Sequence, residues 1–199
     1  MPSKPLVLAF DTSAAHCAAA LLCGDQIVAT RSEALARGQA ERLFPMLEEL
    51  LSESGRSWTD VTRIGVGVGP GNFTGIRISV AAARGLALSL GVPAIGVSAL
   101  EVQCDDAPVL ATVAALRAQV YAQVFDPAPQ SPALMPLAEA EALAKELSLP
   151  LKQNLSAEQL VRAIAARAAT GPATSAPAPL YIRAADAAPP RDPAPVILP

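Results

Sequence analysis

The sequence has little histidine and little cysteine, the residues that most metal centres and many nucleophilic enzymes need. Its 199 residues include one histidine, His16, and three cysteines, Cys17, Cys23 and Cys104. A histidine without partners at ligand spacing supplies neither a zinc site nor a Ser–His–Asp triad, so His16 is expected in a turn. Cys17 and Cys23 stand six residues apart on one expected strand, too distant for a disulfide. These shortages argue against a metal centre, a disulfide framework and a reactive thiol, and they indicate a reduced, cytoplasmic protein.

Aromatic residues and clustered basic residues are also scarce. Aromatics make up 4% of the chain, and 15 scattered basic side chains face 18 acidic ones, a net charge of -3. Without a basic patch interleaved with aromatics, the chain alone is expected to bind nucleic acid poorly. The N-terminus lacks a signal-peptide run, and the most apolar stretch, 73–90, is short for a membrane span and carries Arg77 and Arg84. A soluble protein without membrane association is therefore expected.

The apolar pattern predicts a fold of the α/β class. We expect strands and helices in the following order: strands 6–10, 17–23 and 26–34, helix 39–54, strand 64–68, helix 73–90 and strand 94–97. Three antiparallel strands followed by helix-linked strands are typical of one lobe of an actin-like (ribonuclease H-like) fold. Residues 1–101 are therefore predicted to form an N-terminal actin-like lobe.

The remaining sequence predicts a smaller second lobe and a tail. Strands are expected at 108–113 and 119–125 and helices at 137–147 and 157–168, so residues 102–170 are assigned to a reduced C-terminal lobe. Residues 171–199 are rich in proline and alanine and are expected to be extended or disordered. Within this tail, Leu180-Tyr181-Ile182-Arg183 is the candidate for docking onto the folded part.

The two helices of the N-terminal lobe carry apolar residues on more than one face. In helix 39–54 one face is formed by Leu43, Leu47, Leu50 and Leu51, whereas Phe44 and Met46 are expected off that face, beside Pro45, which should kink the helix or mark its start. In helix 73–90 one face is formed by Ile76, Val80, Ala83, Ala87 and Leu90, and a second, mostly small one by Ile78, Ala82, Gly85 and Ser89. A helix that is apolar nearly all round must be covered on both sides, either by a partner protein or by this chain.

A glycine-rich segment joins the strand at 64–68 to the helix at 73–90. Four glycines and one proline fall within the nine residues from Gly67 to Gly75. A Walker A loop needs a lysine and a serine or threonine after its last glycine, but Ile76 and Arg77 follow here, so the segment is not a nucleotide-hydrolysis loop. It is expected to be either a rigid turn that sets the helix against the sheet or a turn that binds an anion.

The polar stretch Asp11-Thr12-Ser13 ends the first expected strand. Actin-like ATPases place a phosphate- and metal-handling loop here, in which Asp11 could orient a magnesium-bound water while the hydroxyls bind phosphate. Alternatively, these side chains satisfy backbone donors at the strand end. Because no second phosphate loop is recognisable downstream, a nucleotide site and a purely structural loop both stay open.

Several segments resemble the TsaB family, which belongs to the bacterial machinery that makes threonylcarbamoyladenosine in tRNA. They are Leu8-Ala9-Phe10-Asp11-Thr12-Ser13, Glu41-Arg42-Leu43-Phe44-Pro45-Met46-Leu47 and, most specific, Gly67-x-Gly69-Pro70-Gly71-Asn72-Phe73-Thr74-Gly75-Ile76-Arg77. The resemblance is dense over residues 6–101, weaker to 125, and returns at 180–183. It implies an actin-like fold with a full N-terminal lobe and a reduced C-terminal lobe. The chain departs from the family at Gln39-Ala40 and Ala114-Ala115-Leu116, where many relatives have His-Ser and an Asp-Ala-Arg turn.

The resemblance also implies a non-catalytic role, with no catalytic residue in this chain. TsaB-like proteins pair with a related TsaD-like transferase, which modifies adenosine 37 of tRNAs reading ANN codons, and a TsaE-like ATPase joins the assembly. The tRNA is then contacted only through the complex, and exposed apolar helices would let the free chain homodimerise. The implied partner interface consists of Leu43, Phe44, Leu47, Leu51, Phe73, Arg77, Ile78, Ala81, Ala82, Gly85 and Ser89.

No cofactor is firmly implied, although an adenine nucleotide at or near the partner interface is compatible with the resemblance. The main alternative is an independent actin-like nucleotide-binding enzyme that uses Asp11, Thr12 and Ser13. A peptidase-like hydrolase is a further alternative, against which the single histidine speaks.

Overall fold

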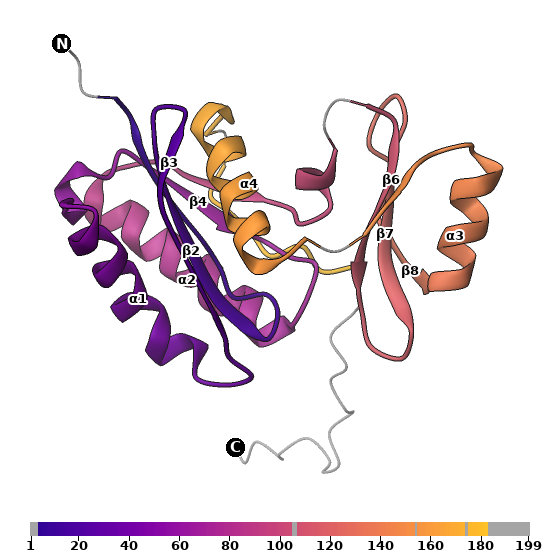
Figure 1. The fold of residues 1–199 in the computed structure, drawn as a ribbon, viewed down its shortest axis with the longest axis horizontal. Helices are drawn as coiled ribbons and strands as arrows, with labels where there is room; N and C mark the ends of the chain where they lie inside the picture. The colour runs from indigo at the N-terminus through magenta and orange to yellow at the C-terminus, as the bar shows by residue number, and fades with distance from the viewer. Residues whose placement is uncertain (1–3, 105–106, 154, 174, 183–199) are drawn as a thin grey trace, which may run out of the picture.

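The computed structural model describes residues 4–104, 107–153, 155–173 and 175–182, which form two lobes (Figure 1). The larger lobe is built on a five-stranded sheet in the order β3-β2-β1-β4-β5. Its strands are β1 (Leu6–Asp11), β2 (His16–Cys23), β3 (Gln26–Ala34), β4 (Arg63–Gly67) and β5 (Ala94–Val97). β1, β2 and β3 pair antiparallel through short hairpins, whereas β4 and β5 run parallel to β1 and each follow a helix. Parallel neighbours need such a crossover, since a tight turn cannot join them.

Two crossover helices cover one face of this sheet. They are α1 (Gln39–Glu53) and α2 (Phe73–Leu90), which follow β3 and β4 in the chain. Side chains alternate along β1, so that Leu8 and Phe10 pack under α1 and α2 while Val7 and Ala9 face the other way. The short 3-10 helices η1 (Trp58–Asp60) and η2 (Glu101–Gln103) lie in the connections. This layer confirms the order of strands and helices predicted for residues 1–101.

The opposite face is covered by α4 (Ala157–Thr170), which comes from late in the chain (Figure 1). Its Val161 and Ile164 are fully buried against Val7 and Ala9 of β1. Without α4, an apolar layer of β1 and β2 would face solvent. The assignment of residues 157–168 to the C-terminal lobe is therefore wrong, because this helix completes the core of the N-terminal lobe.

The second lobe is a four-stranded sheet in the order β8-β7-β6-β9. It consists of β6 (Val109–Ala114), β7 (Gln119–Phe125), β8 (Ala133–Pro136) and β9 (Leu151–Lys152), with α3 (Leu137–Glu146) packed on it. The predicted strand pair and first helix are confirmed. β8 and β9 were not predicted, because strands of four and two residues carry no readable alternation.

The buried face of α1 is wider than the sequence pattern predicted. Met46 is 0% exposed and packs beside Leu43 and Leu47, so the expectation that it lies off the buried face is wrong. Positions 43, 46, 47 and 50 follow the i, i+3, i+4, i+7 spacing of a core-facing helix. Phe44 does lie off that face and is 43% exposed. Pro45 lies inside the helix, which begins at Gln39, and so does not mark its start.

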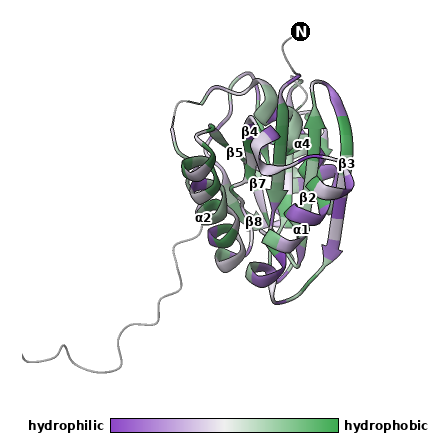
Figure 2. Cartoon of the chain, turned by 90° about the vertical axis from the view of Figure 1, so that its left-hand side faces the viewer, coloured by the Kyte–Doolittle hydropathy of each residue, from purple (hydrophilic) through white to green (hydrophobic). Residues whose placement is uncertain are grey.

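Helix α2 is apolar on both its inward and its outward side. Among the described residues it is the one helix whose length and composition would allow it to cross a membrane, a test that core helices also pass. Its Ile76, Val80 and Ala83 are buried against the sheet. Hydrophobic positions also occur on its outward side, which Figure 2 views together with α1, and Leu88 there is 87% exposed. The core of this lobe therefore buries only the inward side of α2 and leaves its outward apolar residues exposed.

Candidate functional site

The polar loop at the end of β1 lies entirely inside the protein. Asp11, Thr12 and Ser13 are 1%, 0% and 4% exposed. Asp11 Oδ1 accepts hydrogen bonds from the backbone N–H and from the hydroxyl of Ser13, both at 2.9 Å. Thr12 Oγ1 donates to the carbonyl oxygen of Gly75 at 2.7 Å. Both hydroxyls are therefore committed to contacts within the chain.

The glycine-rich segment packs directly on this loop. A β-carbon at Gly75 would lie 1.9 Å from the carbonyl oxygen of Thr12, and one at Gly71 would lie 2.3 Å from that of Ser13. The N–H of Asn72 donates to the Ser13 carbonyl at 2.6 Å, and its side-chain oxygen caps α2 by accepting from the N–H of Gly75 at 2.9 Å. These contacts are those of a rigid turn that sets α2 against the sheet.

His16 has a partner that sequence reasoning missed. It was expected to stand alone in a turn, but it opens β2, and its Nε2 lies 2.7 Å from Oδ1 of Asp11. The signal was present in the sequence, since an antiparallel hairpin brings the end of β1 beside the start of β2. The other carboxylate oxygen of Asp11 has no hydrogen-bond partner, and a β-carbon at Gly67 would lie 1.9 Å from it. Because Gly67 has no side chain, the buried carboxylate of Asp11 can lie against its backbone.

A cleft of about 890 Å³ lies between the two lobes. Its walls come from the loop after β1, the glycine-rich turn, the β6–β7 turn and the segment 180–182. No lysine, arginine, aspartate or glutamate is among the described residues that line it, and Leu116, which does line it, is 79% exposed. The described residues hold no group of three or more His, Cys, Asp and Glu that could bind a metal ion. Within the described part of the chain, the cleft therefore offers no lysine or arginine to neutralise a nucleotide's phosphates.

Most of the residues expected at a partner interface lie at the surface of α1 and α2. Phe44, Phe73, Arg77, Ala81, Gly85 and Ser89 are exposed, and Ile78 and Ala82 are half-buried. Leu43, Leu47 and Leu51 are 1%, 0% and 2% exposed and form part of the chain's own core. Their assignment to a partner interface is therefore wrong, because the core-facing side of α1 has no surface left to offer.

At the N-terminal end of α2, three side chains from distant positions form a stacked cluster. The guanidinium carbon of Arg77 lies 3.8 Å from the centre of the Phe73 ring, and the Phe73 and Tyr181 ring centres are 4.9 Å apart. Nε of Arg77 donates to the Tyr181 hydroxyl at 2.8 Å. Beside them the N–H of Leu180 donates to the carbonyl of Val68 at 2.8 Å. The predicted docking of the tail is confirmed for residues 180–182, while Arg183 lies outside the described residues.

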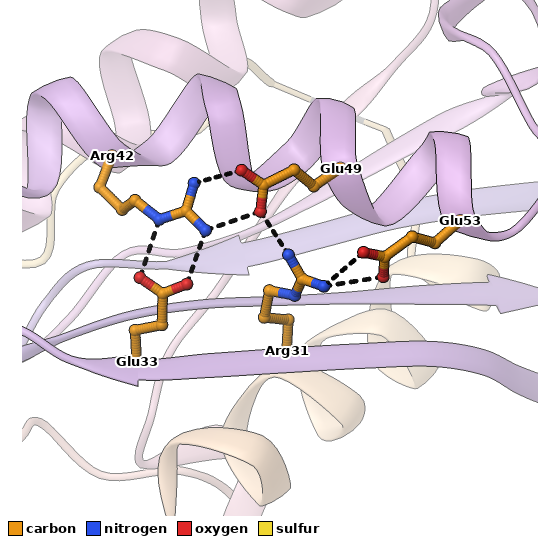
Figure 3. Close-up of polar contacts among 5 residues, drawn as sticks. All are labelled: Arg31, Glu33, Arg42, Glu49 and Glu53. Atoms are coloured by element: carbon orange, nitrogen blue, oxygen red, sulfur yellow. Dashed lines mark hydrogen bonds and ion pairs between the residues drawn. The ribbon is translucent and has the colours of Figure 1, made fainter.

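A charged network ties α1 to the edge strand β3 (Figure 3). Arg42 donates to both carboxylate oxygens of Glu33, at 2.6 and 2.8 Å, and to both of Glu49, at 2.7 and 2.8 Å. Arg31 contacts Glu49 and donates to both oxygens of Glu53 at 2.7 Å. Hydrogen bonds from Arg42 hold the pKa values of Glu33 and Glu49 below their ordinary range. The two arginines pair with three glutamates of the same network, so we interpret it as a structural contact between α1 and β3 and not as a binding site.

The sequence is similar to one known family and to several proteins of known description. The family described as "TsaD: tRNA N6-adenosine threonylcarbamoyltransferase" matches residues 28–180. The "tRNA threonylcarbamoyladenosine biosynthesis protein TsaB" of Escherichia coli is 38% identical over 122 residues, which cover 58% of this chain and 52% of that protein. The protein of the same description from Bacillus subtilis is 38% identical over 95 residues, 48% of this chain and 42% of that protein. The chain thus spans about half the length of these relatives.

Solved structures agree over more of the chain. A Pseudomonas aeruginosa protein, described as uncharacterized "with similarity to peptidase YEAZ", superimposes with a TM-score of 0.69 and 27% identity, covering 90% of this chain and 100% of that one. YeaZ from the same organism gives a TM-score of 0.67 and 26% identity, covering 89% and 99%. The two-lobed α/β architecture, with its actin-like order of elements, is therefore shared with these proteins.

Proposed function

Since the chain belongs to the TsaD family of tRNA N6-adenosine threonylcarbamoyltransferases, and within it to the TsaB proteins of tRNA threonylcarbamoyladenosine biosynthesis, we propose that it is a non-catalytic subunit of that pathway. It binds a TsaD-like transferase and stabilises the active form of that enzyme. The transferase then modifies adenosine 37 of tRNAs that read ANN codons. With a net charge of -3 and no basic stripe, this chain contacts tRNA only through the complex.

The observation that carries this proposal is the outward surface of α1 and α2. Phe44 on α1 and Leu88 on α2 are 43% and 87% exposed there, and the small residues Ala81, Gly85 and Ser89 are also exposed on α2. At Gly85 an added β-carbon would meet no atom within 4 Å, so no packing contact within the described residues requires a glycine there. A glycine inside a helix costs about 1 kcal/mol relative to alanine. Close approach of a partner helix to this surface would account for that cost.

An independent nucleotide-binding enzyme is less well supported. The hydroxyls of Thr12 and Ser13 are used within the chain, and backbone of residues 71–75 packs on the loop. The cleft beside it has no lysine or arginine among the lining residues that the structure describes. An adenine nucleotide would then be held by groups of both subunits. In the same proposal a TsaE-like ATPase joins the assembly.

A co-purification experiment tests the proposed partner surface. Ala81→Arg places a long cation on the exposed side of α2, and Ala166→Arg does the same on the exposed side of α4. Ala81 suits this better than Ala82, which is half-buried against the core. We expect Ala81→Arg to abolish co-purification with the TsaD-like protein of the same organism and Ala166→Arg to leave it intact.

Activity gives a second measurement of the same proposal. Threonylcarbamoyladenosine in tRNA digests, quantified by mass spectrometry, should require this chain together with the transferase and should be lost with Ala81→Arg. ATP turnover by the isolated chain that disappears in Asp11→Ala would instead support the nucleotide-binding enzyme. Pairing with the transferase that survives Ala81→Arg would contradict the proposal.

Size-exclusion chromatography of the free wild-type chain and of Ala81→Arg tests whether the same surface also forms homodimers. A homodimer that uses this surface should be present in the wild type and absent in the variant.

A further inference from the structure

Charge is segregated between the two outward helices. α2 contains two charged residues, Arg77 and Arg84, and no aspartate or glutamate. On α1 the exposed residues Glu41 and Glu48 are acidic, while its one basic residue, Arg42, is bound in the network of Figure 3. A partner that covers both helices therefore meets a cationic helix beside an acidic one.

Of the two arginines on α2, only Arg77 is held in place by other side chains of the described residues. It stacks on Phe73 at 3.8 Å, and its Nε donates to Tyr181 at 2.8 Å. The two terminal nitrogens of its guanidinium have no hydrogen-bond or ion-pair partner within the described part of the chain. A planar guanidinium fixed by stacking, with both terminal NH2 groups free, can bind a carboxylate bidentately through those two groups.

We propose that Arg77 is the carboxylate anchor of the partner surface and that the C-terminal segment, through Tyr181, holds it in its binding conformation. The partner supplies an aspartate or glutamate side chain that both terminal nitrogens of Arg77 contact. This inference rests on the proposed function, because the partner is the TsaD-like transferase. Arginine and aromatic residues that are immobilised before binding lose less conformational entropy on association, so they dominate many interfaces.

Tyr181 is a positioning residue in this scheme. Phe73 is 37% exposed and Tyr181 44%, so neither is buried by the rest of the chain, and their mutual contact is what orders Arg77. The segment that carries Tyr181 is itself fixed by the Leu180–Val68 hydrogen bond at 2.8 Å. Docking of residues 180–182 onto the larger lobe and the orientation of the Arg77 guanidinium are therefore coupled.

Affinity for the purified TsaD-like protein, measured by calorimetry at two salt concentrations, tests the anchor. Arg77→Gln should weaken binding about 30-fold, and Arg77→Lys should restore little of it, because lysine lacks the fork and the flat stacking face. Tyr181→Phe, which keeps the ring and removes the hydroxyl, should weaken binding about three- to tenfold. Added salt should weaken wild type more than Arg77→Gln.

Arg84→Gln is the matched control, since it removes one exposed cation from the same helix without touching the stack. We expect less than a threefold effect. A loss equal to that of Arg77→Gln would overturn the anchor in favour of general charge attraction. Wild-type affinity for Tyr181→Phe would overturn the positioning role.

The anchor and the proposed function can fail separately. If Arg77→Gln binds like wild type while Ala81→Arg does not bind, the anchor is overturned and the partner surface stands. If neither change affects binding, the proposed function falls with it. Unfolding midpoints of each variant, which should match wild type because all the changed side chains are exposed, separate lost binding from lost folding.

Discussion

Single glycines in this protein act in opposite ways within one helix. A β-carbon at Gly75 would lie 1.9 Å from the Thr12 carbonyl oxygen, whereas one at Gly85 would meet nothing within 4 Å. We predict that Gly75→Ala lowers the free energy of unfolding by about 1–3 kcal/mol or more, because fixed backbone must move. Gly85→Ala should raise it by about 0.5–1 kcal/mol, because alanine favours the helix. Urea unfolding of both variants checks the pair, and stabilisation by Gly75→Ala would contradict the packing described.

Cys17 is another residue whose surroundings decide its chemistry. It is 0% exposed, and burial raises the pKa of its thiol to about 11. We predict that iodoacetamide at pH 8 leaves Cys17 unmodified in the folded protein and modifies it in urea. Peptide mass spectrometry of the two samples measures this, and rapid labelling of the native protein would show that the strand opens locally.

At the scale of elements, α1 and β3 are joined by charges whose state depends on pH. In the folded protein the pKa values of Glu33 and Glu49 are lowered, chiefly by hydrogen bonds from Arg42. Glutamates whose pKa is lower in the folded than in the unfolded state stabilise the fold at pH values above the unfolded pKa, which is about 4.3. This stabilisation is lost as the pH falls through the pKa values that the two glutamates have in the folded protein. Arg42→Met should therefore lower the urea midpoint at pH 7 and have a smaller effect at pH 3. An equal effect at both pH values would show that Arg42 acts through packing of its stem alone.

The accuracy with which the sequence predicts helix and strand boundaries and side-chain contacts also differs from element to element. α2 and β3 were placed to the residue, because long periodic stretches bounded by glycine or polar turns leave little choice. Of the second apolar face predicted for α2, Gly85 and Ser89 are exposed, whereas Ile78 and Ala82 are half-buried and pack against the core. The burial of Met46 and the Asp11–His16 contact were both missed, although the sequence held a signal for each: Met46 stands three residues after Leu43, and an antiparallel β1–β2 hairpin brings Asp11 near His16. The Arg77–Tyr181 contact joins residues 104 positions apart, which no local pattern links.

At the scale of the whole molecule, the placement of α4 decides how the lobes are joined. Residues 157–170 lie after the second lobe in the chain, yet Ile164 is 0% exposed in the core of the first. The chain therefore leaves the first lobe after β5 and returns to it after β9 (Figure 1). Two crossings make the smaller lobe an insertion in the larger one, so the stability of the larger lobe depends on residues at both ends of the chain.

This arrangement predicts how a distant core substitution is felt. Ile164→Ala should destabilise the larger lobe by about 2–4 kcal/mol, because it leaves a cavity against β1 and β4. Trp58, the chain's single tryptophan, packs against the α1 side of that lobe and reports its unfolding by fluorescence. The urea midpoint seen by Trp58 should fall with Ile164→Ala. Val124→Ala, a truncation in the core of the smaller lobe, should shift it less. The opposite ranking would mean that α4 stabilises the smaller lobe, and that the larger lobe folds without the C-terminal part of the chain.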